Sequence, residues 1–65
     1  MTRAELLEQL AAIATEWRRH PHLSNDYSEG QRYREIREEL STNFKTTARI
    51  IADRDNVTEY RVVID

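Results

Sequence analysis

The residues most suited to chemistry lie around the single proline of the chain. His20 and His22 flank Pro21, and Ser24 and Asp26 follow a few positions later. Imidazole, hydroxyl and carboxylate groups can act as base, nucleophile and orienting group, and paired imidazoles can bind a transition metal. Such groups work only when folding holds them in a concave site. Because these residues share one short polar connection, we expect a solvated loop with no catalytic residue, no metal and no cofactor.

The length of the chain supports a non-enzymatic interpretation. Its 65 residues make one domain at most, spanning residues 1–65. A domain of this size has little room for a ligand cavity of ~300 Å³ or more. The chain contains no cysteine, so neither disulfides nor thiolate-bound metals can stabilise it. We therefore expect self-association to supply the missing stability.

Arginine supplies all but one of the basic residues. Its planar fork suits phosphates and base edges. If two helices pack antiparallel, five arginines gather around their connection: Arg18, Arg19, Arg32, Arg34 and Arg37. The formal net charge of −2 opposes binding to nucleic acid by bulk charge alone. A small nucleic-acid-binding regulator is therefore the alternative function.

The last residues of the chain form the most functional-looking apolar segment. Branched and aromatic residues alternate with polar ones over 57–64, as is typical of a strand. An uncovered strand edge can pair with another chain. The predicted protein-interface residues are Val57, Tyr60, Val62, Val63 and Ile64. We expect a small non-catalytic interaction module, such as a regulator, an inhibitor or a small subunit, whose partner is another protein or a second copy in a homodimer.

A first helix is expected over residues 3–19. Thr2 and Glu5 have the spacing of a capping box, and Pro21 disfavours helical geometry at His20. Apolar residues at spacings of three and four form one stripe, and the single tryptophan continues it into the core. The stripe consists of Leu6, Leu10, Ile13 and Trp17.

A second helix is expected over residues 28–40. Two caps are possible, Ser28 with Gln31 or Asp26 with Glu29. The residues 41–43 are Ser, Thr and Asn, whose side chains compete for backbone hydrogen bonds. We expect the helix to stop there.

Two strands, 44–52 and 57–64, complete the expected fold around a polar break at 53–56. An odd-length loop of about three or five residues places Ala48 and Ile50 on the same face as Tyr60 and Val62. The prediction is an α+β fold, with two antiparallel helices packed on a C-terminal β-hairpin. The alternative is a helical hairpin whose long second helix runs to about residue 53, because the helical stripe also continues through Ile51. Its C-terminal strand then pairs across a dimer.

The hydropathy pattern indicates no membrane segment. No apolar run approaches the ~18 residues that a spanning helix needs. The start of the chain lacks a basic region followed by an apolar one, so no signal peptide is expected. The expected localisation is cytoplasmic.

Overall fold

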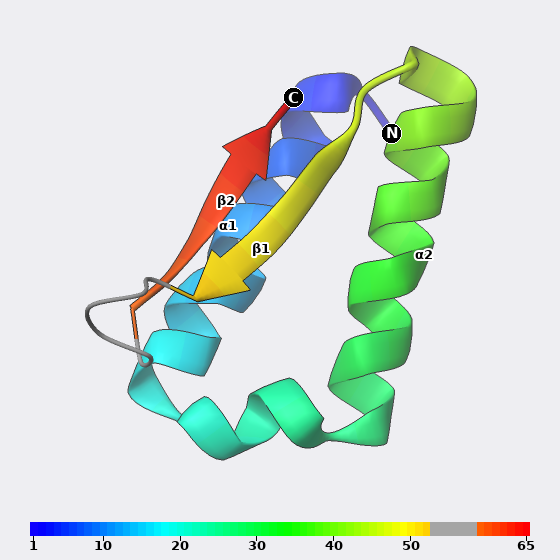
Figure 1. Ribbon diagram of the computed structural model, residues 1–65. Helices are drawn as coiled ribbons and strands as arrows, with labels where there is room; N and C mark the ends of the chain where they lie inside the picture. The colour runs from blue at the N-terminus through cyan, green and yellow to red at the C-terminus, as the bar shows by residue number, and fades with distance from the viewer. Residues whose placement is uncertain (53–58) are drawn as a thin grey trace.

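The computed structural model of the chain describes residues 1–52 and 59–65. The elements are α1 (Arg3–Arg19), a 3-10 helix η1 (Pro21–Asn25), α2 (Tyr27–Phe44), β1 (Ala48–Ala52) and β2 (Tyr60–Ile64). Figure 1 shows α1 and α2 running in opposite directions, joined by η1, with the hairpin against them. The predicted α+β fold is confirmed: two helices pack with a C-terminal antiparallel two-stranded sheet. In the part of the chain that is described, neither helix combines the length and apolar character needed to cross a membrane.

The predicted capping box sets the start of α1. The Thr2 hydroxyl accepts a hydrogen bond from the Glu5 N–H at 3.2 Å, and the Glu5 carboxylate accepts one from the Thr2 N–H at 3.4 Å. Two N–H groups that the first turn leaves without helical partners are thereby satisfied. The helix begins at Arg3 and ends at Arg19, as predicted.

The core lies where both helices meet the hairpin. Trp17 is buried in it, as expected, and the rings of Tyr33 and Tyr60 meet Trp17 edge to face at centroid distances of 5.4 and 5.6 Å. The core takes its buried members from α1, α2 and β1: Leu6, Leu10, Ile13, Trp17, Ile36, Leu40 and Ala48. Since each element contributes to one cluster, no element can bury its apolar face without the others.

Asp26 is the cap that α2 uses. Its Oδ1 accepts hydrogen bonds from the N–H groups of Ser28 at 2.9 Å and Glu29 at 3.3 Å. Of the two caps left open by the sequence, the structure therefore selects the Asp26 cap. The helix starts at Tyr27, one residue before the predicted start.

The predicted end of α2 at residue 40 is wrong, because the helix continues to Phe44. Residues 41–43 are all exposed, so their polar side chains remain in water, and Phe44 packs against the core one turn after Leu40. Packing of Phe44 outweighs the weak helical preference of the three residues before it. The chain then turns at Lys45, whose φ of 49° and ψ of 38° are left-handed. The N–H groups of Lys45 and Thr46 both donate to the Leu40 carbonyl.

Because the helix ends at this turn, the predicted start of the first strand is wrong, and the alternative with a long second helix is excluded. Phe44 belongs to α2, so the strand begins at Ala48 rather than at residue 44. Thr46, in the connection, is buried; its hydroxyl donates to the Phe44 carbonyl at 3.1 Å and accepts from Arg3 Nε at 3.0 Å. These bonds tie the start of α1 to the end of α2.

The face prediction for the hairpin is confirmed. Ala48, Ile50 and Ala52 pair with Ile64, Val62 and Tyr60 respectively. Ala48 is buried, and Ile50, Val62 and Tyr60 pack against the core, so this face meets the helices. The last pair, Ala52 and Tyr60, is separated by residues 53–59. The number of residues between the strands is odd, as predicted, but it is larger than the predicted number of about three or five. The polar break at 53–56, Val57 and Thr58 lie outside the described residues, and β2 begins at Tyr60.

Candidate protein interface

The outward-pointing backbone groups of the hairpin can be assigned from its register. The Asp65 N–H donates to the Thr47 carbonyl at 2.9 Å, so these two residues form a hydrogen-bonded pair. Such pairs alternate with non-hydrogen-bonded pairs along an antiparallel ladder. Ala48, Ile50 and Ala52 therefore direct their N–H and C=O groups away from β2. Tyr60, Val62 and Ile64 direct theirs away from β1.

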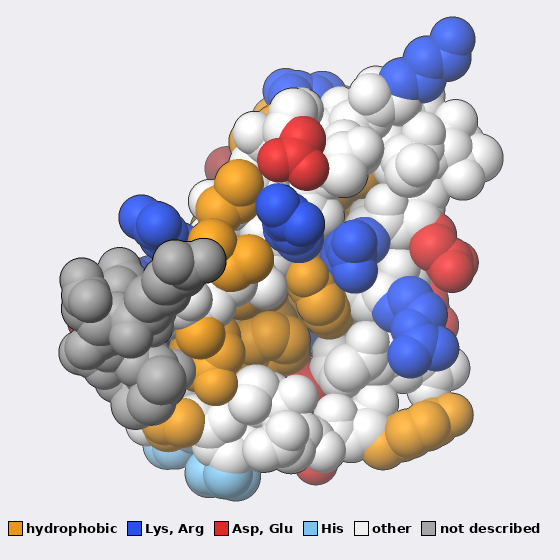
Figure 2. All heavy atoms as spheres, in the orientation of Figure 1, with side chains coloured by type: hydrophobic (Ala, Val, Ile, Leu, Met, Phe, Trp, Pro, Cys, Tyr) orange, Lys and Arg blue, Asp and Glu red, His pale blue; other side chains and the backbone are white. Residues whose placement is uncertain are grey.

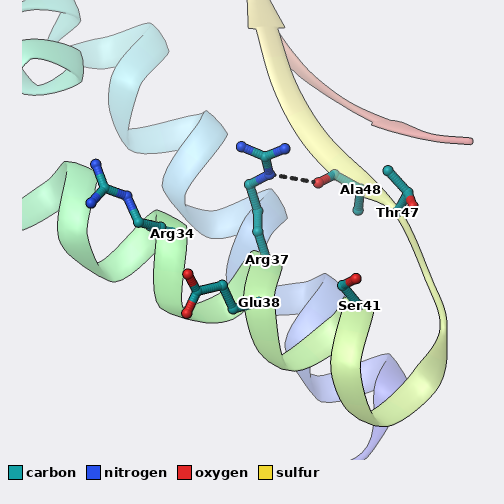
Figure 3. Close-up of a pocket in the computed structure, with 6 residues that line it drawn as sticks. All are labelled: Arg34, Arg37, Glu38, Ser41, Thr47 and Ala48. Carbon is teal, nitrogen blue, oxygen red and sulfur yellow. Dashed lines mark hydrogen bonds between the residues drawn. The ribbon is translucent and has the colours of Figure 1, made fainter.

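Side chains of α2 cover the outer edge of β1. The Tyr33 hydroxyl accepts a hydrogen bond from the Ile50 N–H at 2.8 Å. Arg37 Nε donates to the Ala48 carbonyl at 3.1 Å, and Figure 3 shows this bond joining α2 to the strand. The Arg37 guanidinium also lies 5.3 Å from the centroid of the Tyr33 ring, a cation–π contact that helps to hold both side chains in place. Two outward backbone groups of β1, the Ala48 C=O and the Ile50 N–H, are thus satisfied by side chains of α2.

No residue in 1–52 or 59–65 covers the outer edge of β2. Among the described residues, none forms a hydrogen bond with the outward N–H and C=O groups of Val62 and Ile64. In Figure 1, no other described element lies along the left-hand side of β2. A row of unpaired donors and acceptors on a strand is a template for another strand. This edge can therefore form backbone hydrogen bonds with an added strand.

The predicted interface residues do not share one surface. The Tyr60 ring packs on Trp17 and its hydroxyl donates to Ser24 Oγ at 3.2 Å, while the Val62 side chain packs against the core. These two residues offer a partner their backbone rather than their side chains. Val63 lies on the outer face and is partly buried, and Ile64 is 49% exposed at the end of the strand. Val57 lies outside the described residues.

The structure separates the predicted arginine patch into different surfaces. Arg34 and Arg37 line a hollow of ≈ 270 Å³ between α2 and β1, together with Glu38 and Thr47 (Figure 3). Arg32 instead lines a hollow on the α1 side. Residues two apart on a helix point in nearly opposite directions, about 200° apart, which explains why Arg32 and Arg34 diverge.

The remaining members of that predicted patch lie at the end of α1. Arg18 Nη2 donates to Thr15 Oγ1 at 3.1 Å, and Arg19 is exposed in the last turn. Arg32 shares its hollow with Glu16 and Glu29, which places carboxylates close to it. The five arginines therefore do not form one continuous basic surface.

Two further arginines reach the surface on the hairpin. Arg49 and Arg61 lie on its outer face, because the residues that alternate with them along the two strands pack on the helices. These residues are Ile50, Tyr60 and Val62. Figure 2 shows Lys and Arg side chains across the hairpin side of the molecule, interspersed with hydrophobic ones. The alternation of residues along the strands predicts that Arg49 and Arg61 share a face of the hairpin. It predicts that this face is the exposed one only when the face that meets the helices is known.

The two histidines are exposed at the junction of α1 and η1. Their rings lie 5.9 Å apart, edge to face. In residues 1–52 and 59–65, no group of three or more His, Cys, Asp or Glu side chains is arranged to hold a metal ion. The imidazoles thus contact each other and solvent.

No family model, curated protein or solved structure matches the chain. A fold of two helices and a hairpin does not by itself specify a function, since function depends on the sites that a fold carries. In this chain, the candidate sites are the outer edge of β2 and the surfaces beside it.

Proposed function

We propose that the chain is a small non-catalytic protein-binding module that acts as a regulator, an inhibitor or a small subunit. Its binding site is the outer edge of β2, to which a partner adds a strand. The observation that carries this proposal is the difference between the two edges: Tyr33 and Arg37 bond to outward backbone groups of β1, whereas no described residue bonds to those of Val62 and Ile64 on β2. In strand addition, main-chain hydrogen bonds supply affinity and neighbouring side chains supply specificity.

The side chains beside this edge suit such a role. Ile64 is 49% exposed and Val63 is partly buried on the outer face. A strand laid along β2 would remove their apolar area from water, at about 25 cal/mol per Å². Arg61 and Asp65 flank them and would select a partner by charge.

Proline at Val62 is expected to abolish partner binding and leave the fold intact. The Val62 N–H points away from β1, and edge strands tolerate proline where the N–H faces solvent. The substitution therefore removes a hydrogen-bond donor that a partner strand would use. It leaves the hydrogen bonds between β1 and β2 in place. Pull-down from the native cell with an untagged C-terminus measures partner binding, and urea unfolding measures stability.

Val63→Pro is the matched control. The Val63 N–H lies in a hydrogen-bonded pair with Arg49 inside the hairpin. Its loss should lower the free energy of unfolding by about 1–3 kcal/mol, because a ladder partner is left unsatisfied. Unchanged partner binding by a folded Val62→Pro protein would rule out the β2 edge as the binding site.

A nucleic-acid-binding regulator is the second candidate, and one observation favours it. Tyr27 is 83% exposed and lines a hollow together with Arg34. Arg34 also lines the neighbouring hollow that contains Arg37. An exposed aromatic ring beside arginines can stack bases and neutralise phosphates of a single strand. Fluorescent oligonucleotide binding should then weaken steeply with added salt and fall in Tyr27→Ala. Absence of binding at low salt would eliminate this candidate.

A further inference from the structure

We infer that the strand added to β2 is β2 of a second copy, in an antiparallel pair whose twofold axis passes through Val63. In this arrangement Arg61 of each copy faces Asp65 of the other. The inference rests on the proposed function, because it uses the same open edge. It goes further in specifying the occupant and the register.

The direction of the backbone groups limits the possible pairings. Only Tyr60, Val62 and Ile64 direct hydrogen-bonding groups outward, so a second strand must bond to these residues. A symmetric antiparallel pair centred on an interior residue of β2 places Arg61, Val62 or Val63 on the twofold axis. Each choice brings different side chains opposite one another.

Charge distinguishes the three registers. With Arg61 on the axis, two arginines face each other. With Val62 on the axis, Glu59 faces Asp65 at both ends of the pair. With Val63 on the axis, Arg61 faces Asp65 twice. Opposite charges across strands are favourable and like charges are unfavourable, so the segment Arg61–Asp65 is complementary to itself in the last register alone.

The apolar residues agree with the same register. Val63 meets its own copy on the outer face, in a non-hydrogen-bonded pair where side chains approach closely. On the helix side, Val62 lies opposite Ile64, whose side chain is 49% exposed in the single chain. The result is a four-stranded sheet with the helices of both copies on one face, a two-layer arrangement that enlarges a small core.

Charge reversal tests the register through affinity. Arg61→Glu and Asp65→Arg each convert both opposite-charge pairs into like-charge pairs. Each should raise the dimer Kd by roughly 10- to 30-fold in sedimentation equilibrium. An equimolar mixture of the two variants should form a heterodimer of nearly the original affinity, because both pairs are again of opposite charge. Arg34→Glu is the matched control, since it makes the same charge change on α2, on the β1 side of the molecule, and should leave the Kd unaltered.

A cysteine pair tests the register through geometry. The natural chain has no cysteine, so an introduced one can bridge only to its copy. Residues opposite each other in a non-hydrogen-bonded pair have Cα atoms about 4.5 Å apart, within disulfide range. Oxidised Val63→Cys should therefore form a covalent dimer quantitatively. Val62→Cys should not, and it would do so instead if Val62 were on the axis.

The outcomes separate this inference from the function on which it rests. Dimerisation that Val62→Pro abolishes and that the mixed variants restore supports both. Dimerisation that Val62→Pro abolishes but charge reversal leaves unchanged overturns the register and keeps the edge. A chain that stays monomeric at high concentration, yet loses a foreign partner through Val62→Pro, overturns the second copy and keeps the proposed function. A dimer indifferent to Val62→Pro overturns this inference, and unchanged binding of a foreign partner by the same variant overturns the proposed function.

Discussion

Replacing Leu40 with alanine is expected to lower the free energy of unfolding by about 2–5 kcal/mol. The Leu40 side chain is 0% exposed and belongs to the cluster shared by both helices and the hairpin. Its removal leaves a cavity that neighbouring side chains fill only in part. A single core in a chain below about 70 residues rarely supplies more than about 3–5 kcal/mol. The variant should therefore be largely unfolded at 25 °C.

Ser41→Ala is the control, because it makes an alanine substitution at the next position of α2 on an exposed residue. Alanine has the higher helix propensity, so this change should be neutral or slightly stabilising. Far-UV circular dichroism during urea titration measures both variants. A Leu40→Ala protein as stable as Ser41→Ala would mean that the two helices do not share this core.

Trp17→Ala is expected to destabilise the fold by about 3–5 kcal/mol. Trp17 is 5% exposed and touches the rings of Tyr33 and Tyr60, so its loss removes contacts to α2 and β2 together. Aromatic pairs in this edge-to-face geometry contribute about 0.5–1.5 kcal/mol beyond their buried area. Circular dichroism rather than fluorescence must follow unfolding, since the chain has no other tryptophan.

Trp17→Phe separates the ring from its N–H group. In the described part of the structure, the buried Trp17 Nε1 has no hydrogen-bond partner, so phenylalanine forfeits volume but no hydrogen bond. This variant should retain much more stability than Trp17→Ala. Equal losses in the two variants would show that the indole N–H, rather than aromatic packing, stabilises the core.

The sequence predicts the parts of the fold that depend on local patterns. Thr2 and Glu5 specify the start of α1, and alternation specifies which hairpin residues meet the helices. The end of α2 could not be predicted in this way. Residues 41–43 favour termination locally, but the contact of Phe44 with the core outweighs that preference, and only the folded chain contains this contact.

The candidate site divides in the same manner. The strand that carries the candidate interface follows from its residue types, whereas the hydrogen bonding along each outer edge of the hairpin does not. Tyr33 and Arg37 cover β1 because α2 places them beside it, across 17 and 11 positions of sequence from their backbone partners. Helical geometry likewise directs Arg32 and Arg34 to different surfaces. Packing between elements, which residue types alone do not encode, decides both.

The aromatic cluster around Trp17 has a consequence for the order in which the molecule assembles. Tyr33 reaches Trp17 across the short α1–α2 connection, whereas Tyr60 reaches it only after most of the chain has been looped back. The entropy lost on closing a loop grows with its length. The Trp17–Tyr33 contact therefore closes at a smaller entropic cost than the Trp17–Tyr60 contact, and β2 is expected to complete the aromatic cluster. The indole ring, whose surroundings change as each tyrosine reaches it, is thus a natural fluorescent reporter of folding.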